Sequence, residues 1–279
     1  MTVATFDAMG TSVDVHIKDH SDVDVAKAMF DRYEGLFSRF DPDSELSRIN
    51  RANTSLTVSV DMRALLGAAK ELRVATDGLT DIGIGAAVRG WGYTTTFDEV
   101  VDSDAVPLPV WPGAWSMDGD RVTLAAGTML DLGGIAKGWT SDRIVEAGVA
   151  TVVSAGGDIR SSDPTLVVEI LDGDDAVAAE VAVGVGALAT SSRMRRRWRT
   201  GAIRAHHIID PRTGSPAVTP VLSASVIAET AVEAEAGAKA VLILGADGLA
   251  WADEQDWIRA AVAIWYDGNV YATSEVRAA

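Results

Sequence analysis

The chain contains the stretch Ala261-Val-Ala-Ile-Trp-Tyr266, followed by Asp267-Gly268 and then Asn269-Val-Tyr-Ala-Thr273. An Asp-Gly step between two apolar runs is a strong signal of a β-hairpin, because both residues tolerate the backbone conformation of a tight turn. A second hairpin is predicted for residues 166–171 and 177–183, around an acidic turn at 172–175. Hairpins pair antiparallel strands, so this pattern favours an α+β fold over a parallel doubly wound sheet.

Helical patterns surround these hairpins. Apolar residues with 3–4 spacing predict an amphipathic helix over 21–38 and a second helical face at Met62, Leu65, Leu66, Ala69 and Leu72. Thr230 and Glu233 have the spacing of a capping box, which predicts a helix that ends near Gly245. We therefore expect antiparallel sheets with packed helices.

Composition and charge exclude several classes of function. The 279 residues include 24 Lys and Arg against 40 Asp and Glu, a net charge of -16, which argues against binding to nucleic acid or anionic membranes. There is no Cys, so thiolate catalysis, disulfides and Cys-bound zinc are excluded. No apolar run approaches the length of about 18 residues needed for membrane insertion. No export signal is recognisable, so we expect a cytoplasmic protein.

Glycine-rich turns are the first candidates for chemistry. Asp131-Leu-Gly-Gly-Ile-Ala-Lys-Gly138 precedes a predicted helix from about Trp139 to Ala147, and such a turn can bind a phosphate through backbone N–H groups and Lys137. A tight turn with a surface lysine is the equally weighted alternative. Ser154-Ala-Gly-Gly-Asp158 offers the same choice, with a simple turn favoured.

Histidine and arginine clusters are the next candidates. His206 and His207 are neighbours, and because adjacent side chains on a strand point to opposite faces, only one is expected to face a site. Arg193-Met-Arg-Arg-Arg-Trp-Arg199 holds five arginines, four of which share one face if the segment is a strand. That face can bind a phosphate, a nucleotide or an acidic partner, or it can be a solvated surface. Glu235 and Lys239 are spaced either for an ion pair or for contact with a ligand.

The order of these segments resembles the ApbE family of flavin transferases. The resemblance starts at Ala8-Met-Gly-Thr11, covers nearly the whole chain, and is most specific at 131–138 and at His207-Ile-Ile-Asp-Pro-Arg-Thr-Gly214. It implies one compact domain over 1–279 with an α+β architecture related to the T-fold. Independently of the resemblance, the prolines and glycines of residues 94–119 predict a surface excursion. It also implies FAD as donor, a divalent metal, usually Mg, and transfer of FMN to a Thr or Ser hydroxyl of an acceptor flavoprotein.

The resemblance also assigns roles to individual residues. His207 matches the functionally important histidine, and we predict that it orients or deprotonates the acceptor hydroxyl or contacts the diphosphate. Gly134, through its carbonyl, and Glu235 match metal-ligand positions. The remaining matches are with FAD-contact positions: Met9, Phe40, Leu79, Thr80, Asp81, Asp131 and Lys137.

Two metal-ligand positions depart from the family pattern. The family places Asp and, four residues later, Thr as metal ligands where this chain has Glu235 and Lys239. A protonated lysine cannot coordinate a metal and repels it, so we predict weakened metal dependence, with Lys239 as a site residue beside the diphosphate. The alternatives to the transferase are an FAD diphosphatase that releases FMN and AMP, and a protein that binds FAD without turnover.

Overall fold

The computed structural model describes residues 2–52 and 54–274 and divides the chain into two compact units. The first unit is formed by the chain up to Asp31, by Lys137–Met194 and by the chain from Val218 onwards. The second is formed by Arg32–Ala136 and Arg195–Ala217. Each unit therefore combines segments that are distant in the sequence.

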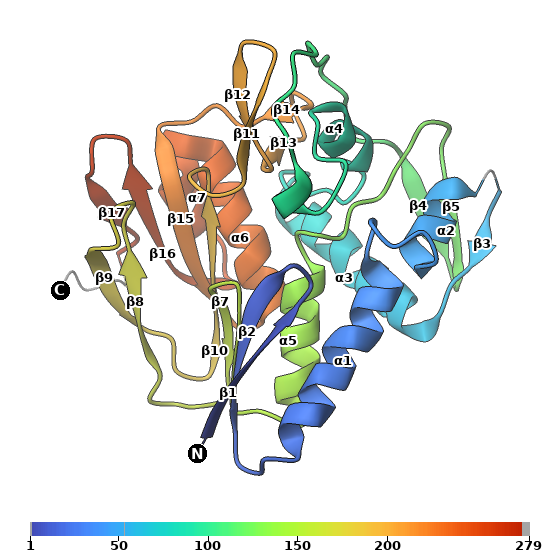
Figure 1. Ribbon diagram of the computed structural model, residues 1–279. Helices are drawn as coiled ribbons and strands as arrows, with labels where there is room; N and C mark the ends of the chain where they lie inside the picture. Colours follow the sequence, from blue (N-terminus) through green and yellow to red (C-terminus); the bar gives the residue numbers. More distant parts are fainter. Residues whose placement is uncertain (1, 53, 275–279) are drawn as a thin grey trace. The chain divides into compact units, whose positions relative to one another are not determined.

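The first unit is built on an antiparallel sheet whose strand order is β1-β2-β6-β7-β10-β15-β16-β17 (Figure 1). Its strands are β1 (Thr2–Ala8), β2 (Thr11–Ile17), β6 (Val152–Ala155), β7 (Asp158–Ser161), β10 (Gly186–Ser192), β15 (Val221–Ala228), β16 (Ile258–Trp265) and β17 (Val270–Ala272). The expected α+β fold and the hairpin that ends in β17 are confirmed.

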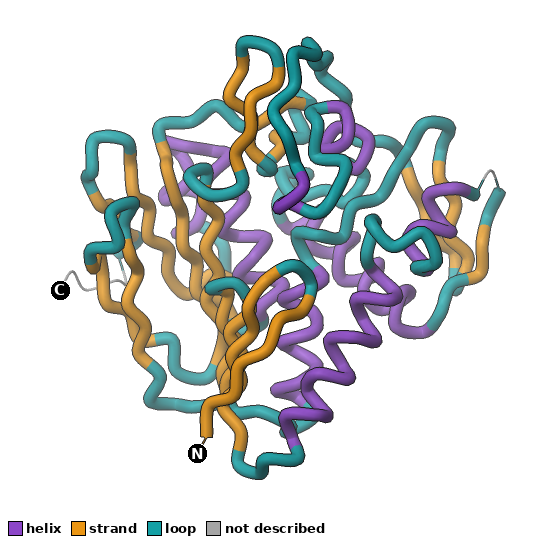
Figure 2. The backbone as a smooth tube through the Cα atoms, in the orientation of Figure 1, coloured by secondary structure: helices purple, strands orange, loops and turns teal. Residues whose placement is uncertain are grey.

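Helices pack on one face of this sheet and a hairpin packs on the other (Figure 2). The elements that cover it are α1 (Asp22–Phe37, of which the residues up to Asp31 belong here), α5 (Ala136–Glu146), α6 (Ala231–Leu244), η2 (Gly245–Asp247), α7 (Gly248–Asp253), and the hairpin of β8 (Val167–Leu171) and β9 (Val177–Ala182). Successive strand residues alternate between the faces: Leu188 packs towards the hairpin, whereas Ala187 and Ala189 pack against α6. Because the residues facing α6 are small, the helix lies close to the sheet.

The second unit combines short helices with small sheets. Its elements are α2 (Glu45–Arg51), β3 (Leu56–Thr57), α3 (Val60–Ala75), α4 (Gly85–Gly90), η1 (Phe97–Glu99), β4 (Trp115–Asp118), β5 (Arg121–Leu124), β11 (Arg197–Thr200), β12 (Ile203–His206), β13 (Ile209–Asp210) and β14 (Ser215–Pro216). Helix α3 buries the five apolar residues predicted for its face and ends at Ala75. Trp91 and Trp198 belong to a hydrophobic core of this unit, in which the indole of Trp198 donates to the Trp91 carbonyl at 2.7 Å.

Two local predictions are wrong. Helix α5 begins at Ala136, so Lys137 and Gly138 lie in its first turn instead of in the preceding loop. The arginine segment is not one continuous strand, because Arg196 has a φ of 50° and β11 begins only at Arg197. Only Arg197 and Arg199 therefore share a strand face. No helix within the described ranges is both long and apolar enough to span a bilayer.

Candidate functional site

Two tight turns lie beside each other at one end of the large sheet. Met9 and Gly10 have φ values of 50° and 69° and connect β1 to β2, and Gly156 and Gly157 connect β6 to β7. Strands β2 and β6 pair, so the turns are neighbours, and a Cβ on Gly156 would lie 2.6 Å from the Thr11 hydroxyl. The paired glycines thus allow close packing of the turns. Together the turns place Met9 and Asp158 at the same end of the sheet.

Four charged side chains meet at this end of the first unit. Lys137 Nζ lies 3.3 Å from Asp158 Oδ2 and 3.4 Å from Glu235 Oε1. Lys239 Nζ lies 3.3 Å from Glu235 Oε2 and donates to the Glu235 carbonyl at 3.2 Å. The Gly138 N–H donates to Glu235 Oε1 at 2.9 Å. We call these four residues, Lys137, Asp158, Glu235 and Lys239, the lysine–carboxylate cluster.

The charges of the cluster are held in a largely dry environment. The side chain of Glu235 is 3% exposed, and that of Lys239 is 26% exposed. Burial by itself disfavours the Glu235 carboxylate, but Lys137, Lys239 and the Gly138 N–H outweigh it and keep the pKa of Glu235 below its ordinary value. Burial raises the pKa of Asp158, a shift that Lys137 opposes and the charge of Glu235 reinforces. The two lysines therefore favour the ionised form of Glu235, whereas burial disfavours the ionised form of Asp158.

The N-terminus of α6 is fixed by a buried carboxylate from α5. Asp142 accepts hydrogen bonds from the N–H groups of Ala231 (2.9 Å) and Val232 (3.2 Å), and its Oδ1 lies 2.9 Å from Arg160 Nε. Burial raises the pKa of Asp142 to about 6 against these favourable contacts. Thr230 and Glu233 form the predicted capping box at the same helix end. These bonds hold α6, and with it Glu235, against α5.

Met9 belongs to the same region of the first unit. Its sulfur accepts a long hydrogen bond of 4.0 Å from the Thr140 hydroxyl in the second turn of α5. A positive φ is uncommon for methionine, and such backbone strain is often found at functional positions. The structure thus brings together four of the predicted site residues: Met9, Lys137, Glu235 and Lys239.

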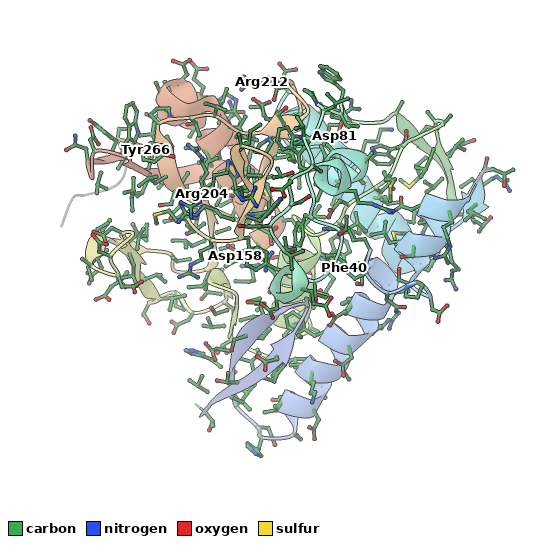
Figure 3. The ribbon with its side chains drawn as sticks, turned by 45° about the horizontal axis from the view of Figure 1, so that its top comes forward. Phe40, Asp81, Asp158, Arg204, Arg212 and Tyr266 are labelled. Carbon is green, nitrogen blue, oxygen red and sulfur yellow. The ribbon has the colours of Figure 1, made fainter. Side chains whose placement is uncertain are left out.

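In the second unit, Arg39 contacts two of the predicted residues, Asp131 and Phe40. Its Nε lies 2.8 Å from Asp131 Oδ2, and its guanidinium stacks 4.1 Å above the Phe40 ring centre and 4.5 Å above that of Tyr93. Arg39 also donates to the Tyr93 carbonyl at 2.8 Å. Phe40, labelled in Figure 3, remains 38% exposed and has one ring face towards the arginine. The arrangement presents an aromatic ring of fixed orientation.

Residues Leu79, Thr80 and Asp81 support the loop that follows α3. Leu79 is buried, and the Thr80 hydroxyl lies 2.8 Å from that of Thr76. Asp81 accepts from the Gly83 N–H at 2.7 Å and lies 2.7 Å from Arg73 Nε. The same loop meets the Asp131 segment through a hydrogen bond from the Asp131 N–H to the Ile82 carbonyl. These side chains shape the backbone next to Asp131.

The two neighbouring histidines have different environments. His206 is buried: its Nε2 lies 3.0 Å from the Ala217 carbonyl, and its Nδ1 accepts from the Ile208 N–H at 3.3 Å. These bonds require a neutral ring with the proton on Nε2. His207 follows β12 and is half-buried. His206 is therefore a structural residue, which leaves His207 as the candidate for chemistry.

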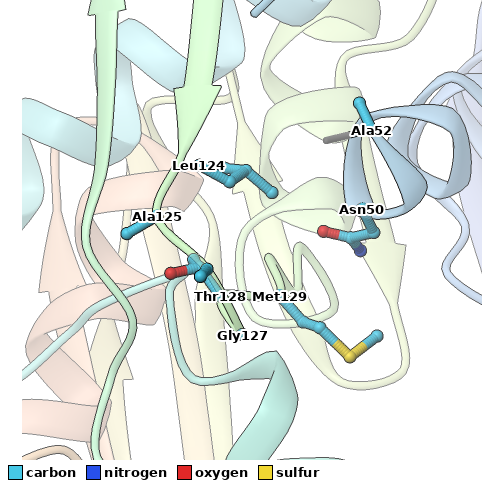
Figure 4. A pocket seen from close by; sticks show the side chains of 8 residues that line it. Asn50, Ala52, Leu124, Ala125, Gly127, Thr128 and Met129 are labelled. Carbon is cyan, nitrogen blue, oxygen red and sulfur yellow. The ribbon is translucent and has the colours of Figure 1, made fainter. Parts of the chain in front are cut away.

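A separate cavity of about 340 Å³ lies in the second unit (Figure 4). It is lined by Asn50, Ala52, Leu124, Ala125, Ala126, Gly127, Thr128 and Met129. The Asn50 side chain is occupied by hydrogen bonds to the Leu130 backbone. This cavity contains none of the predicted site residues.

Three residues of these sites were missing from the predicted set: Arg39, Asp142 and Asp158. Arg39 and Asp158 lie inside segments that carry the family resemblance, but only the fold shows that they bind Asp131 and Lys137. Asp142 has no sequence signal, because its partners are backbone groups 89 and 90 residues away.

The cluster does not fit a divalent metal ion. Both carboxylate oxygens of Glu235 are engaged, Oε1 by Gly138 and Lys137 and Oε2 by Lys239. Within residues 2–52 and 54–274, no three His, Asp or Glu side chains form a group that could hold a metal. The two lysine nitrogens lie within 3.4 Å of the Glu235 oxygens, where they repel a further cation. The backbone of Gly134 is exposed, and its carbonyl as a metal ligand remains a prediction.

The chain belongs to the ApbE family, whose model matches residues 9–262. It is 32% identical over 255 residues to the FAD:protein FMN transferase of Rhodobacter capsulatus, with 84% of this chain and 49% of that protein covered. For the FAD:protein FMN transferase of Treponema pallidum the identity is 30%, with 81% and 72% covered. The chain thus spans about half the length of the Rhodobacter relative.

A solved structure has the same fold. The crystal structure of the ApbE protein from Thermotoga maritima matches with a TM-score of 0.86 and 26% identity, over 98% of this chain and 97% of that one. The predicted family and its α+β architecture are therefore confirmed.

Proposed function

We infer that this chain is an enzyme that transfers FMN from FAD to a Thr or Ser hydroxyl of an acceptor flavoprotein and releases AMP. Family membership and two relatives named FAD:protein FMN transferase support this function. The observation that carries it to this chain is the lysine–carboxylate cluster, which holds two ammonium groups at the beginning of α5 and on α6. We also propose that both units belong to one transferase domain, because the family match draws on segments of each.

The proposed reaction is a phosphoryl transfer. The acceptor hydroxyl oxygen attacks the FMN-side phosphorus of FAD, and the bond from that phosphorus to the oxygen bridging to AMP breaks. The leaving AMP keeps the electron pair of that bond, and His207 takes the hydroxyl proton. Such a reaction needs positioning and charge neutralisation more than a protein nucleophile, which suits a chain without cysteine.

Six of the predicted residues have a proposed role in binding FAD for this reaction. Lys137 and Lys239 neutralise the diphosphate, and Glu235 and Asp158 hold the two ammonium groups in place. Phe40 and Met9 contact the flavin or adenine ring, and Asp131, held by Arg39, binds the nucleotide. We propose that the Lys239 ammonium supplies part of the positive charge that Mg provides in the family, so that metal dependence is weak. A cytoplasmic location and a Ser/Thr flavinylation motif on the acceptor remain predictions.

The products of one incubation separate this function from its alternatives. The chain is incubated with FAD and a purified electron-transfer flavoprotein domain that carries a Ser/Thr flavinylation motif, with and without Mg. Nucleotide chromatography and in-gel flavin fluorescence then identify the products. A fluorescent acceptor together with AMP supports the transferase. Free FMN with AMP would show an FAD diphosphatase, and intact FAD would show a protein that only binds the nucleotide.

A further inference from the structure

The hairpin of β11 and β12 carries an exposed arginine face. Arg199 lies directly opposite Arg204 in the strand register, and Arg197 precedes Arg199 by two residues on the same face. Like charges opposite each other disfavour strand pairing, so this arrangement has a local cost. Asp104 Oδ1, 2.9 Å from Arg199 Nη1, offsets part of the cost. Arg197 and Arg204 are exposed, and neither forms an ion pair with another described residue.

An apolar segment is anchored along this hairpin. The Ser103 N–H donates to the Arg199 carbonyl at 2.9 Å, and the Gly201 N–H donates to the Ser103 carbonyl at 2.8 Å. Directly after this anchor, three large apolar side chains are exposed: Val106 by 78%, Leu108 by 74% and Trp111 by 61%. Figures 1 and 2 show this loop beside the β11–β12 hairpin, in the same unit.

These two features form one continuous surface. Val106 lies beside Gly201, where a Cβ on the glycine would be 3.5 Å from Val106 Cγ2, and the Trp111 indole donates to the Arg212 carbonyl at 3.2 Å. The loop is thus fixed to the hairpin side of the unit while its apolar side chains point to solvent. We call the surface formed by Val106, Leu108, Trp111, Arg197, Arg199 and Arg204 the arginine–tryptophan surface; Figure 3 labels Arg204 and Arg212.

The chemistry of this surface fits a protein partner. Exposed apolar groups beside arginine and tryptophan are typical of protein interfaces, in which these two residues often dominate the binding energy. Arg197 and Arg199 are separated by about 7 Å along the strand, the spacing of alternate side chains in an extended peptide. In a chain of net charge -16, Arg197 and Arg204, which form no ion pair with another described residue, favour an acidic partner.

We propose that the arginine–tryptophan surface is the docking surface for the acceptor protein, which it binds through an acidic segment that also carries apolar side chains. This inference rests on the proposed transferase function, because that function requires a protein substrate. The surface supplies affinity and orientation for the acceptor and takes no part in the chemical step.

The test combines charge reversal with a matched control. The variant R197E/R204E reverses two exposed arginines of the surface, and R63E/R121E reverses two exposed arginines elsewhere in the same unit. KM is measured for FAD and for the purified acceptor domain at 50 and 300 mM NaCl. We expect R197E/R204E to raise the acceptor KM about tenfold at low salt, to leave the FAD KM within twofold, and to lose its effect at high salt. The control double variant should behave as wild type.

A binding measurement keeps this inference separate from the proposed function. A fluorescein-labelled peptide of alternating Glu and Leu should bind wild type about tenfold more tightly than R197E/R204E, and its Lys–Leu counterpart should bind neither protein. If wild type transfers no FMN but this difference is found, the proposed function fails, and the surface is shown only to bind an acidic segment with apolar side chains. The inference is overturned if R197E/R204E leaves acceptor KM and peptide affinity unchanged, or if it raises the FAD KM equally, which would identify a nucleotide site.

Discussion

Replacement of Lys239 tests whether an ammonium group stands in for a metal in this site. Lys239 Nζ lies 3.3 Å from Glu235 Oε2, and at an effective dielectric of about 20 this separation corresponds to about 5 kcal/mol of attraction. Solvent reaches part of the lysine, and Glu235 keeps Lys137 and the Gly138 N–H. We therefore expect K239M, which keeps the apolar stem without the charge, to lose about 2 kcal/mol of stability.

The K239T variant is expected to gain the ability to bind Mg. K239T removes the ammonium and introduces a hydroxyl that can join Glu235 as an oxygen ligand, so it should acquire affinity for Mg. With a Kd of about 0.1 mM, 5 mM Mg would stabilise it by about 2 kcal/mol, which offsets the loss of the ion pair. Wild type and K239M should show no such stabilisation.

Thermal unfolding with and without 5 mM Mg measures these effects, because about 2 kcal/mol corresponds to a shift in Tm of about 4–8 °C in a protein of this size. Calorimetric titration with Mg and the transfer rate in EDTA complete the assay. Wild type should keep its transfer rate in EDTA. The reasoning would be refuted if wild type bound Mg tightly at one equivalent, gained the same Tm shift and lost transfer in EDTA.

Three further predictions concern other residues of the site. H207A should lower the transfer rate by about 10²- to 10⁴-fold with unchanged Tm, and wild-type transfer by H207A would exclude His207 as the base. H206A should lose about 2 kcal/mol of folding stability, because the Ala217 carbonyl and the Ile208 N–H lose their hydrogen-bond partner. F40A should weaken FAD binding about fivefold in a fluorescence titration. F40Y should bind FAD as wild type does, because only the aromatic ring is needed for stacking. Equal FAD affinities of F40A and wild type would contradict a contact at Phe40. The folded-state pKa of Asp142 is raised to about 6, so its contribution to stability decreases by about 2 kcal/mol as pH rises from 4 to 7. The stability of D142N relative to wild type, measured by urea unfolding, should increase by that amount over the same range. A constant difference would refute the assignment.

The structure gives the arginine segment a different role from the one its spacing suggested. Spacing alone predicted a four-arginine face, but Arg196 interrupts the strand with a positive φ and Arg193 lies in the other unit, over the Tyr266 ring. The face that carries Arg197 and Arg199 gains its third arginine, Arg204, from the neighbouring strand β12. A cross-strand neighbour cannot be read from spacing along one strand, because register depends on the intervening turn.

Local patterns in the sequence were sufficient for most secondary elements and for the family. The hairpins, the buried face of α3 and the capping box of α6 depend on interactions between residues a few positions apart, so periodicity and turn chemistry predict them. The DLGGIAKG and HIIDPRTG segments likewise indicated the family without any structure. The helix start at Ala136 was missed because the first turn of α5 carries no polar N-cap signal in the sequence.

Tertiary structure alone decided how the charges of the site are paired. Glu235 lies 98 residues from Lys137, and Asp131 lies 92 residues from Arg39, so no local rule relates either pair. The sequence showed that Lys239 occupies a metal-ligand position of the family, whereas the fold shows that both oxygens of Glu235 are taken by nitrogen donors. It also distinguishes His206, bound through both ring nitrogens, from His207. The physical reason is the same in each case: burial and charge pairing depend on which distant segments pack together, and the sequence determines that packing only through the whole fold.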